Sequence, residues 1–139
     1  MTKNNLADKT VVVYDDQIAR IFADEIRLYL QCKCMAYNSA MSCLKDLEEG
    51  LEFDLLFSDL SIEDLGKFHR GPRLSGEDIV KLVKEKYPQV PIVTISANAV
   101  RPAGSNYHFI KPLMNTEGYL EVISAYLEKR FVTRDATKY

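Results

Sequence analysis

The stretch Phe53-Asp54-Leu55-Leu56-Phe57-Ser58-Asp59 decides the fold of this chain. Its central apolar run, Leu55 to Phe57, is typical of a strand buried on both faces of a parallel sheet. The run ends at Asp59, and open α/β sheets bind their ligands at the carboxyl ends of the strands. Asp59 is therefore the first candidate for a functional residue.

Three other apolar runs also end in polar side chains. They are residues 11–14 before Asp15 and Asp16, residues 91–95 before Ser96 and Ala97, and residues 107–110 before Lys111 and Pro112. Three acids, a hydroxyl and an ammonium thus each follow an expected strand. The functional hypothesis depends on this repetition.

Helical patterns separate these strands. We expect a short second strand at residues 34–37 and helices over about residues 17–31, 40–50, 75–87 and 115–131. The alternation indicates an α/β fold, a flavodoxin-like doubly wound five-stranded parallel sheet with strand order 2-1-3-4-5. We interpret residues 1–139 as a single domain with its core at about residues 10–132 and a polar tail at residues 133–139.

Two connections depart from a regular alternation. Residues 60–75 lack periodicity and contain Gly66, Gly71 and Pro72, which predicts a long, mobile loop beside the site. Only ten residues, 97–106, join the last two strands, and Pro102 and Gly104 oppose a helix there. The fourth helix is therefore expected to be short or missing, which would expose apolar sheet surface.

Composition excludes several classes of protein. The net charge of -2 and the pI of about 5.7 give no electrostatic case for binding nucleic acid or a membrane surface. No apolar stretch could span a bilayer, and residues 1–10 lack the apolar core of a signal peptide, so a cytoplasmic protein is expected. Cys32, Cys34 and Cys43 are read as buried thiols rather than as disulfides or metal ligands.

The expected strand order brings the polar strand ends together at one edge of the sheet. Asp15, Asp16 and Asp59 would repel one another without a cation, and Mg²⁺ suits such a carboxylate cluster. Lys111 and Ser96 add a positive charge and a hydroxyl donor, and the small Ala97 leaves room for a phosphoryl group. Asp59 could then act as a nucleophile that forms an aspartyl phosphate.

These residues give the chain a resemblance to the receiver domain of two-component response regulators, in a stand-alone, CheY-like form. The matching pieces are Asp15-Asp16, Asp59, Ser96-Ala97 and Lys111-Pro112, in the family's order over about residues 10–131. The resemblance implies a phosphorylation-controlled signalling module of a phosphorelay, not an enzyme beyond self-catalysed phosphoryl transfer to and from Asp59. Its phosphoryl donor would be a histidine kinase or a phosphotransfer protein.

The resemblance also implies residue roles. Asp16 and Asp59 would bind Mg²⁺ directly, Asp15 would support it through water, and Ser61 would give a backbone carbonyl. Ser96 and Lys111 would hold the phosphoryl group, and the Lys111-Pro112 bond is a candidate for a cis peptide. The family's switch aromatic falls at His108, and the loop after Asp59 lacks the family's Met-Pro pair, so the switch region is atypical.

An output face is expected on the last strand and the last helix. Its candidate contacts with an unknown downstream protein, or with a second copy in a homodimer, are Tyr107, Tyr119, Val122 and Tyr126. Half-buried packing of the helix residues is the competing interpretation.

Alternative functions and plainer interpretations stay open. The chain could be a pseudo-receiver that is never phosphorylated, or a phosphatase working through an aspartyl intermediate, although Ser61 stands where the common phosphatase pattern has an acid. Flavin binding is a remote option. Asp15-Asp16 could simply cap a helix, His108 could be a packed strand residue, and the basic residues of 67–73 could be a solvated loop face.

Overall fold

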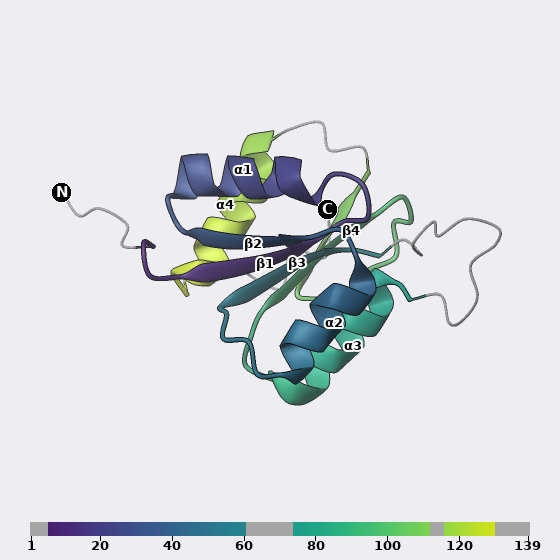
Figure 1. The fold of residues 1–139 in the computed structure, drawn as a ribbon. Helices are drawn as coiled ribbons and strands as arrows, with labels where there is room; N and C mark the ends of the chain where they lie inside the picture. The colour runs from purple at the N-terminus through teal and green to yellow at the C-terminus, as the bar shows by residue number, and fades with distance from the viewer. Residues whose placement is uncertain (1–5, 61–73, 112–115, 130–139) are drawn as a thin grey trace.

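The computed structural model describes residues 6–60, 74–111 and 116–129, in which strands and helices alternate (Figure 1). The elements in chain order are β1 (Thr10–Tyr14), α1 (Ala19–Leu30), β2 (Lys33–Tyr37), α2 (Ala40–Glu48), β3 (Leu55–Asp59), α3 (Gly76–Lys86), β4 (Ile92–Ser96), β5 (Tyr107–Ile110) and α4 (Thr116–Leu127). All described elements lie within a few residues of the positions that the sequence predicts.

The five strands form one parallel sheet in the order β2-β1-β3-β4-β5, which confirms the predicted topology. Asp59 pairs with Ile95, and Ser96 pairs with Ile110. Because all strands run in the same direction, the polar residues that follow them meet at one edge.

Two layers of helices cover the sheet. Figure 1 shows α1 and α4 on one face and α2 and α3 on the other. The central strand contributes to both layers, since Leu55 and Phe57 pack under α1 and α4 while Leu56 packs under α2 and α3. Phe57 stacks on Tyr119, with ring centroids 5.4 Å apart. The predicted burial of this strand on both faces is confirmed.

Helix α3 begins as the sequence predicts. The Ser75 hydroxyl accepts a hydrogen bond from the Glu77 amide at 3.1 Å, and the Asp78 carboxylate accepts one from the Ser75 amide at 2.8 Å. This capping box satisfies amides that have no partner within the helix. It fixes the start of α3 directly behind the end of β3.

No helix joins β4 to β5 within residues 97–106, as predicted from Pro102 and Gly104. The segment instead pairs with β4 through hydrogen bonds, since the Asn106 amide donates to the Ile92 carbonyl at 2.7 Å and the Ile92 amide donates to Asn106 Oδ1 at 2.8 Å. These bonds attach the segment to β4 directly, so the chain passes from β4 to β5 without a helix.

The uncovered face of β4 and β5 differs in part from the expected apolar surface. Ile110 is 45% exposed and Val100 is 72% exposed, as an apolar patch requires. However, Thr94 is buried under this face and hydrogen-bonds to Ser105 and His108, at 2.8 and 2.7 Å. Buried or half-buried polar side chains therefore occupy part of this face, where an exposed apolar surface was expected.

Tyr119 is not a surface contact, so that part of the predicted output face is wrong. Its side chain is only 1% exposed, and its hydroxyl donates to the Glu25 carboxylate of α1. Helix α4 carries apolar residues on several sides, and the ring of Tyr119 fills the space between α1 and β3. Tyr107, Val122 and Tyr126 are half-buried.

Several expectations fall outside the described residues. They are the loop at residues 61–73 including Ser61, the Lys111-Pro112 bond, the cap of the last helix, and residues 130–139. No helix within residues 6–60, 74–111 and 116–129 is long and apolar enough to cross a bilayer.

Candidate functional site

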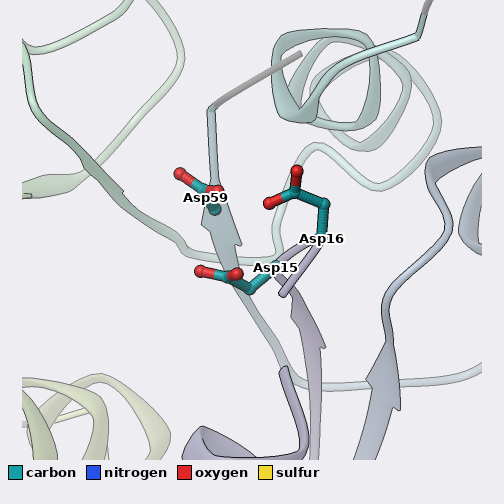
Figure 2. Close-up of side chains that lie close together, drawn as sticks. All are labelled: Asp15, Asp16 and Asp59. Atoms are coloured by element: carbon teal, nitrogen blue, oxygen red, sulfur yellow. The ribbon is translucent and has the colours of Figure 1, made fainter. Parts of the chain in front are cut away.

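Three carboxylates meet at the carboxyl edge of the sheet (Figure 2). Asp15 and Asp16 follow β1, Asp59 ends β3, and one oxygen of each lies within 4.8 Å of the others. Asp15 and Asp59 are each 1% exposed, while Asp16 is partly exposed. The predicted acidic cluster therefore exists, with two of its members withdrawn from water.

Asp15 also shapes the turn into α1. Its Oδ1 accepts hydrogen bonds from the amides of Gln17 and Ile18, at 2.9 and 3.0 Å. The N-cap of α1 is Ile18, which makes no side-chain cap, so Asp15 acts one turn earlier than a helix cap would. Its other oxygen, Oδ2, faces Lys111.

Lys111 reaches two of the three carboxylates from the end of β5. Its Nζ lies 3.3 Å from Asp59 Oδ1 and 3.5 Å from Asp15 Oδ2. The Lys111 side chain is 32% exposed, so the ammonium keeps some contact with water. Lys111 thereby connects the carboxyl ends of β1, β3 and β5, as the strand order predicted.

Among the residues that the structure describes, one ammonium lies against three carboxylates and does not balance their charge. Burial raises the pKa of Asp16, the negative charges of Asp59 and Asp15 raise it further, and Lys111 only partly opposes them. The cluster thus holds like charges together against their repulsion. Mg²⁺ binds carboxylate oxygens and usually keeps several water ligands. The three adjacent carboxylates, one of which is partly exposed, therefore fit this cation.

Gly76, the first residue of α3, packs on the backbone of Asp59. A β-carbon at Gly76 would lie 1.6 Å from the Asp59 carbonyl oxygen and 2.8 Å from Ser58 Oγ. No larger residue fits without moving one element. This contact is not among the features predicted from the sequence, although a glycine in the first turn after a capping serine is a sign of close approach.

Ser96 lies at the expected edge, but its hydroxyl bonds elsewhere. Within the described residues its hydrogen-bond partners are Asn98, through the amide at 3.1 Å and the carbonyl at 3.0 Å, and His108 Nε2 at 3.2 Å. Its backbone carbonyl accepts from the Lys111 amide at 2.8 Å. The structure therefore brings Ser96 to the site, while Asn98 and His108, which the sequence analysis did not connect with it, hold the side chain.

A cavity of about 380 Å³ opens beside Ser96. Its lining residues are Leu60, Glu77, Ser96, Ala97, Asn98, Val100 and Pro102. Ala97 is the smallest of these side chains. The cavity therefore lies next to Leu60, the residue that follows Asp59.

Comparisons with known proteins support the fold. No protein-family model and no curated protein matches the sequence. Among solved structures, an uncharacterized protein from Neptuniibacter caesariensis superposes with a TM-score of 0.70 at 24% identity, covering 97% of this chain and 98% of that one. A CheY-like response regulator receiver domain protein from Methanospirillum hungatei JF-1 gives a TM-score of 0.67 at 20% identity, covering 88% and 96%.

A third similar structure is the signal receiver domain of a putative Luxo repressor protein from Vibrio parahaemolyticus. Its TM-score is 0.66 at 15% identity, with 88% of this chain and 92% of that chain covered. At these identities the likeness concerns the fold. The sheet order, the helix layers and these neighbours show that the protein has the fold of CheY-like response regulator receiver domains.

Proposed function

We propose that this protein is a phosphorylation-controlled signalling module that accepts a phosphoryl group on Asp59 and thereby changes its binding to a partner protein. The observation that carries the proposal is the cluster of Asp15, Asp16 and Asp59 with the ammonium of Lys111 3.3 Å from Asp59. A phosphorylation site needs a nucleophile, a cation site and a fixed positive charge in one place, and the proposal gives these roles to Asp59, to the three carboxylates and to Lys111.

Asp59 is the nucleophile in this proposal. One of its carboxylate oxygens attacks the phosphorus of a phosphohistidine or a small acyl phosphate, an O–P bond forms, and the donor's P–N or P–O bond breaks with its electrons leaving on the donor. Lys111 is placed to neutralise charge on the phosphoryl oxygens, because its Nζ already lies 3.3 Å from Asp59 Oδ1. Mg²⁺ bound by Asp16 and Asp59, with Asp15 in support, would supply the further positive charge that three carboxylates and a phosphoryl group require.

Ser96 is proposed as a donor to the phosphoryl group. Its hydroxyl must give up the Asn98 carbonyl to reach that group, so phosphorylation would disturb the segment that Asn98 begins. This segment leads to β5, where Tyr107 is half-buried and Ile110 is exposed. A charge change at Asp59 would thus alter the surface of the sheet edge.

The proposed output face is β5 with the neighbouring side chains of α4, Val122 and Tyr126. Tyr126 links the two elements, since its hydroxyl donates to the Asn106 carbonyl at 3.3 Å. We propose that a downstream protein or a second copy of this chain binds there, and that a histidine kinase or a phosphotransfer protein supplies the phosphoryl group.

Intact-mass measurement after incubation with acetyl phosphate and Mg²⁺ tests the proposal. Wild type should gain one phosphoryl mass, and Asp59→Asn should gain none. Asp54→Asn is the matched control, because Asp54 precedes β3 at the opposite edge, where its Oδ2 accepts from the Thr10 amide at 2.8 Å. A wild type that never gains the phosphoryl mass would instead indicate a pseudo-receiver.

A further inference from the structure

Another cavity lies at the amino edge of the sheet, at the opposite end of the strands from the carboxylate cluster. Its volume is about 490 Å³, within the range of about 300–1,000 Å³ that is typical of sites for small ligands. Its wall includes Lys9 before β1, Asp54 before β3 and Asn106 before β5. A molecule bound there would leave the carboxyl edge of the sheet free.

Three lysines from separate parts of the chain border this cavity. Lys9 precedes β1 and is half-buried, while Lys84 on α3 and Lys129 after α4 are exposed. Among the residues that the structure describes, none of these three ammonium groups forms an ion pair with a carboxylate. All three are therefore available to an anion in the cavity.

One carboxylate, that of Asp54, also lies on the described part of the wall. Its Oδ2 accepts a hydrogen bond from the Thr10 amide at 2.8 Å, and the Asp54 amide donates to the Thr10 carbonyl at 2.8 Å. Asp54 thus joins the beginnings of β1 and β3. Three ammonium groups against one carboxylate leave two positive charges, which a ligand with two negative charges would balance.

Apolar and aromatic side chains form another part of the wall, among them Phe53, Val90 and Tyr126. The Tyr126 hydroxyl donates to the Asn106 carbonyl at 3.3 Å, and the Phe53 ring packs edge-on against Tyr87, with ring centroids 4.9 Å apart. Both rings are therefore held in place before any ligand arrives. A ligand with an apolar group beside its charge would bury that group against them.

The backbone at Lys129 fixes where its side chain leaves the end of α4. Its φ of 59 lies in the left-handed region, which glycine favours at helix ends, and its amide donates to the Tyr126 carbonyl at 3.1 Å. A lysine is thus held here against its backbone preference. Such residues concentrate at ligand sites, where the side chain is needed.

We propose that this cavity binds a small organic phosphate, a phosphate monoester with an apolar group, through the ammonium groups of Lys9, Lys84 and Lys129. A phosphate monoester carries about two negative charges at neutral pH and offers several acceptor oxygens to the three donors. Its apolar group packs against Phe53 and Tyr126. Binding does not depend on phosphorylation of Asp59, because the two sites lie at opposite edges of the sheet.

Titration of ¹⁵N-labelled protein with phenyl phosphate, at constant ionic strength in EDTA, tests the proposal. EDTA removes the divalent cations through which the carboxylate cluster would bind a phosphate. The amide signals of Lys9, Asn106 and Lys129 should shift saturably. The absence of saturable shifts, or shifts confined to Asp15 and Asp59, overturns the proposal.

Two further probes separate the charge of the ligand from its ring. Phenol lacks the charge and inorganic phosphate lacks the ring, so each should bind at least about threefold more weakly than phenyl phosphate. Raising the concentration of NaCl should weaken the binding of phenyl phosphate and leave that of phenol unchanged, since salt screens exposed charges. Either probe binding as tightly as phenyl phosphate contradicts the proposal.

Substitutions of the lysines test their role directly. Lys84→Met and Lys129→Met should each weaken the binding of phenyl phosphate by about three- to tenfold, because each removes one charged donor from a partly exposed site. Lys81→Met is the matched control, since Lys81 is exposed on the same helix as Lys84 but does not line the cavity, and its affinity should stay within about twofold of wild type. Equal affinities of Lys84→Met and Lys81→Met overturn the proposal.

Discussion

Gly76 and Asp59 meet backbone to backbone, so closely that a β-carbon on Gly76 would lie 1.6 Å from the Asp59 carbonyl oxygen. The contact joins the first turn of α3 to the last residue of β3. The capping box of Ser75 and Asp78 stabilises that first turn of α3. The position of the candidate phosphoacceptor is therefore set by a glycine that is distant from it in sequence.

Gly76→Ala should lower both stability and phosphorylation. Either α3 or the end of β3 must move, which is expected to cost about 2–4 kcal/mol of unfolding free energy. Urea unfolding and the phosphoryl yield from acetyl phosphate measure the two effects. Gly50→Ala is the control, because Gly50 has φ of +95 and a β-carbon added there would meet no other part of the chain within 4 Å, so it should cost about 1 kcal/mol of strain without reducing the yield. A normal yield in Gly76→Ala would contradict the positioning role.

Lys111→Met should destabilise the fold in the absence of metal. It leaves the buried Asp15 and Asp59 carboxylates without their ammonium, at an expected cost of about 1–3 kcal/mol. Lys45→Met is the matched control, since Lys45 pairs with Glu49 at 3.6 Å on the surface, with the two side chains 72% and 62% exposed, and should cost less than about 0.5 kcal/mol. Thermal unfolding in EDTA compares the two variants. An equal loss of unfolding free energy in both would show that the Lys111 ion pairs stabilise the fold no more than a surface pair does.

Asp16→Asn should stabilise the protein in EDTA at pH 7 and weaken its stabilisation by Mg²⁺. The pKa of Asp16 is raised in the fold, so between 3.8 and that raised value the folded state binds more protons than the unfolded state. The contribution of Asp16 to the unfolding free energy is therefore lost as the pH rises through the raised pKa. Removing the charge should raise the unfolding free energy by about 0.5–1.5 kcal/mol at pH 7.

The gain in Asp16→Asn should disappear below about pH 3.8, where the carboxyl is protonated in both states. Differential scanning fluorimetry with EDTA or Mg²⁺ across this pH range measures both effects. Asp8→Asn, at an exposed position, should show neither of them. A variant that is stabilised by Mg²⁺ as strongly as wild type would place the cation elsewhere.

Beryllofluoride and Mg²⁺ should change the backbone amide shifts of residues 97–110 and of α4 more than those of α1. Ser96 and His108 connect the site to this edge, and Tyr126 connects the edge to α4. Ile110→Ser should weaken partner binding or self-association without changing the phosphoryl yield, because Ile110 is exposed beyond the site. Shift changes confined to α1 would contradict the proposed output face.

The strand order and the acidic cluster could be predicted from sequence because each depends on local patterns. Apolar runs mark buried strands, and their polar ends must meet at one edge once the sheet is parallel. The missing helix between β4 and β5 was equally predictable, since Pro102 and Gly104 interrupt a segment that is already short.

Other features depend on contacts that no local pattern encodes. Tyr119 could face solvent or the core, since α4 is apolar on several sides, and only its packing on Phe57 decides. The bonds of His108 depend on the pairing of Thr94 with His108, a register that the sequence suggests but does not fix to one residue. Gly76 was overlooked because close approach is a property of two elements rather than of one.

The short connection between β4 and β5 also bears on how the chain folds. Thr94 and His108 are paired across only 14 positions, whereas the hydrogen bond from Thr10 to Asp54, beside the pairing of β1 with β3, spans 44. Closing the shorter loop costs about 1 kcal/mol less chain entropy than closing the longer one. Among the four strand pairs of the sheet, β4 with β5 therefore has the lowest entropic cost of loop closure, at the edge that carries Lys111 and His108.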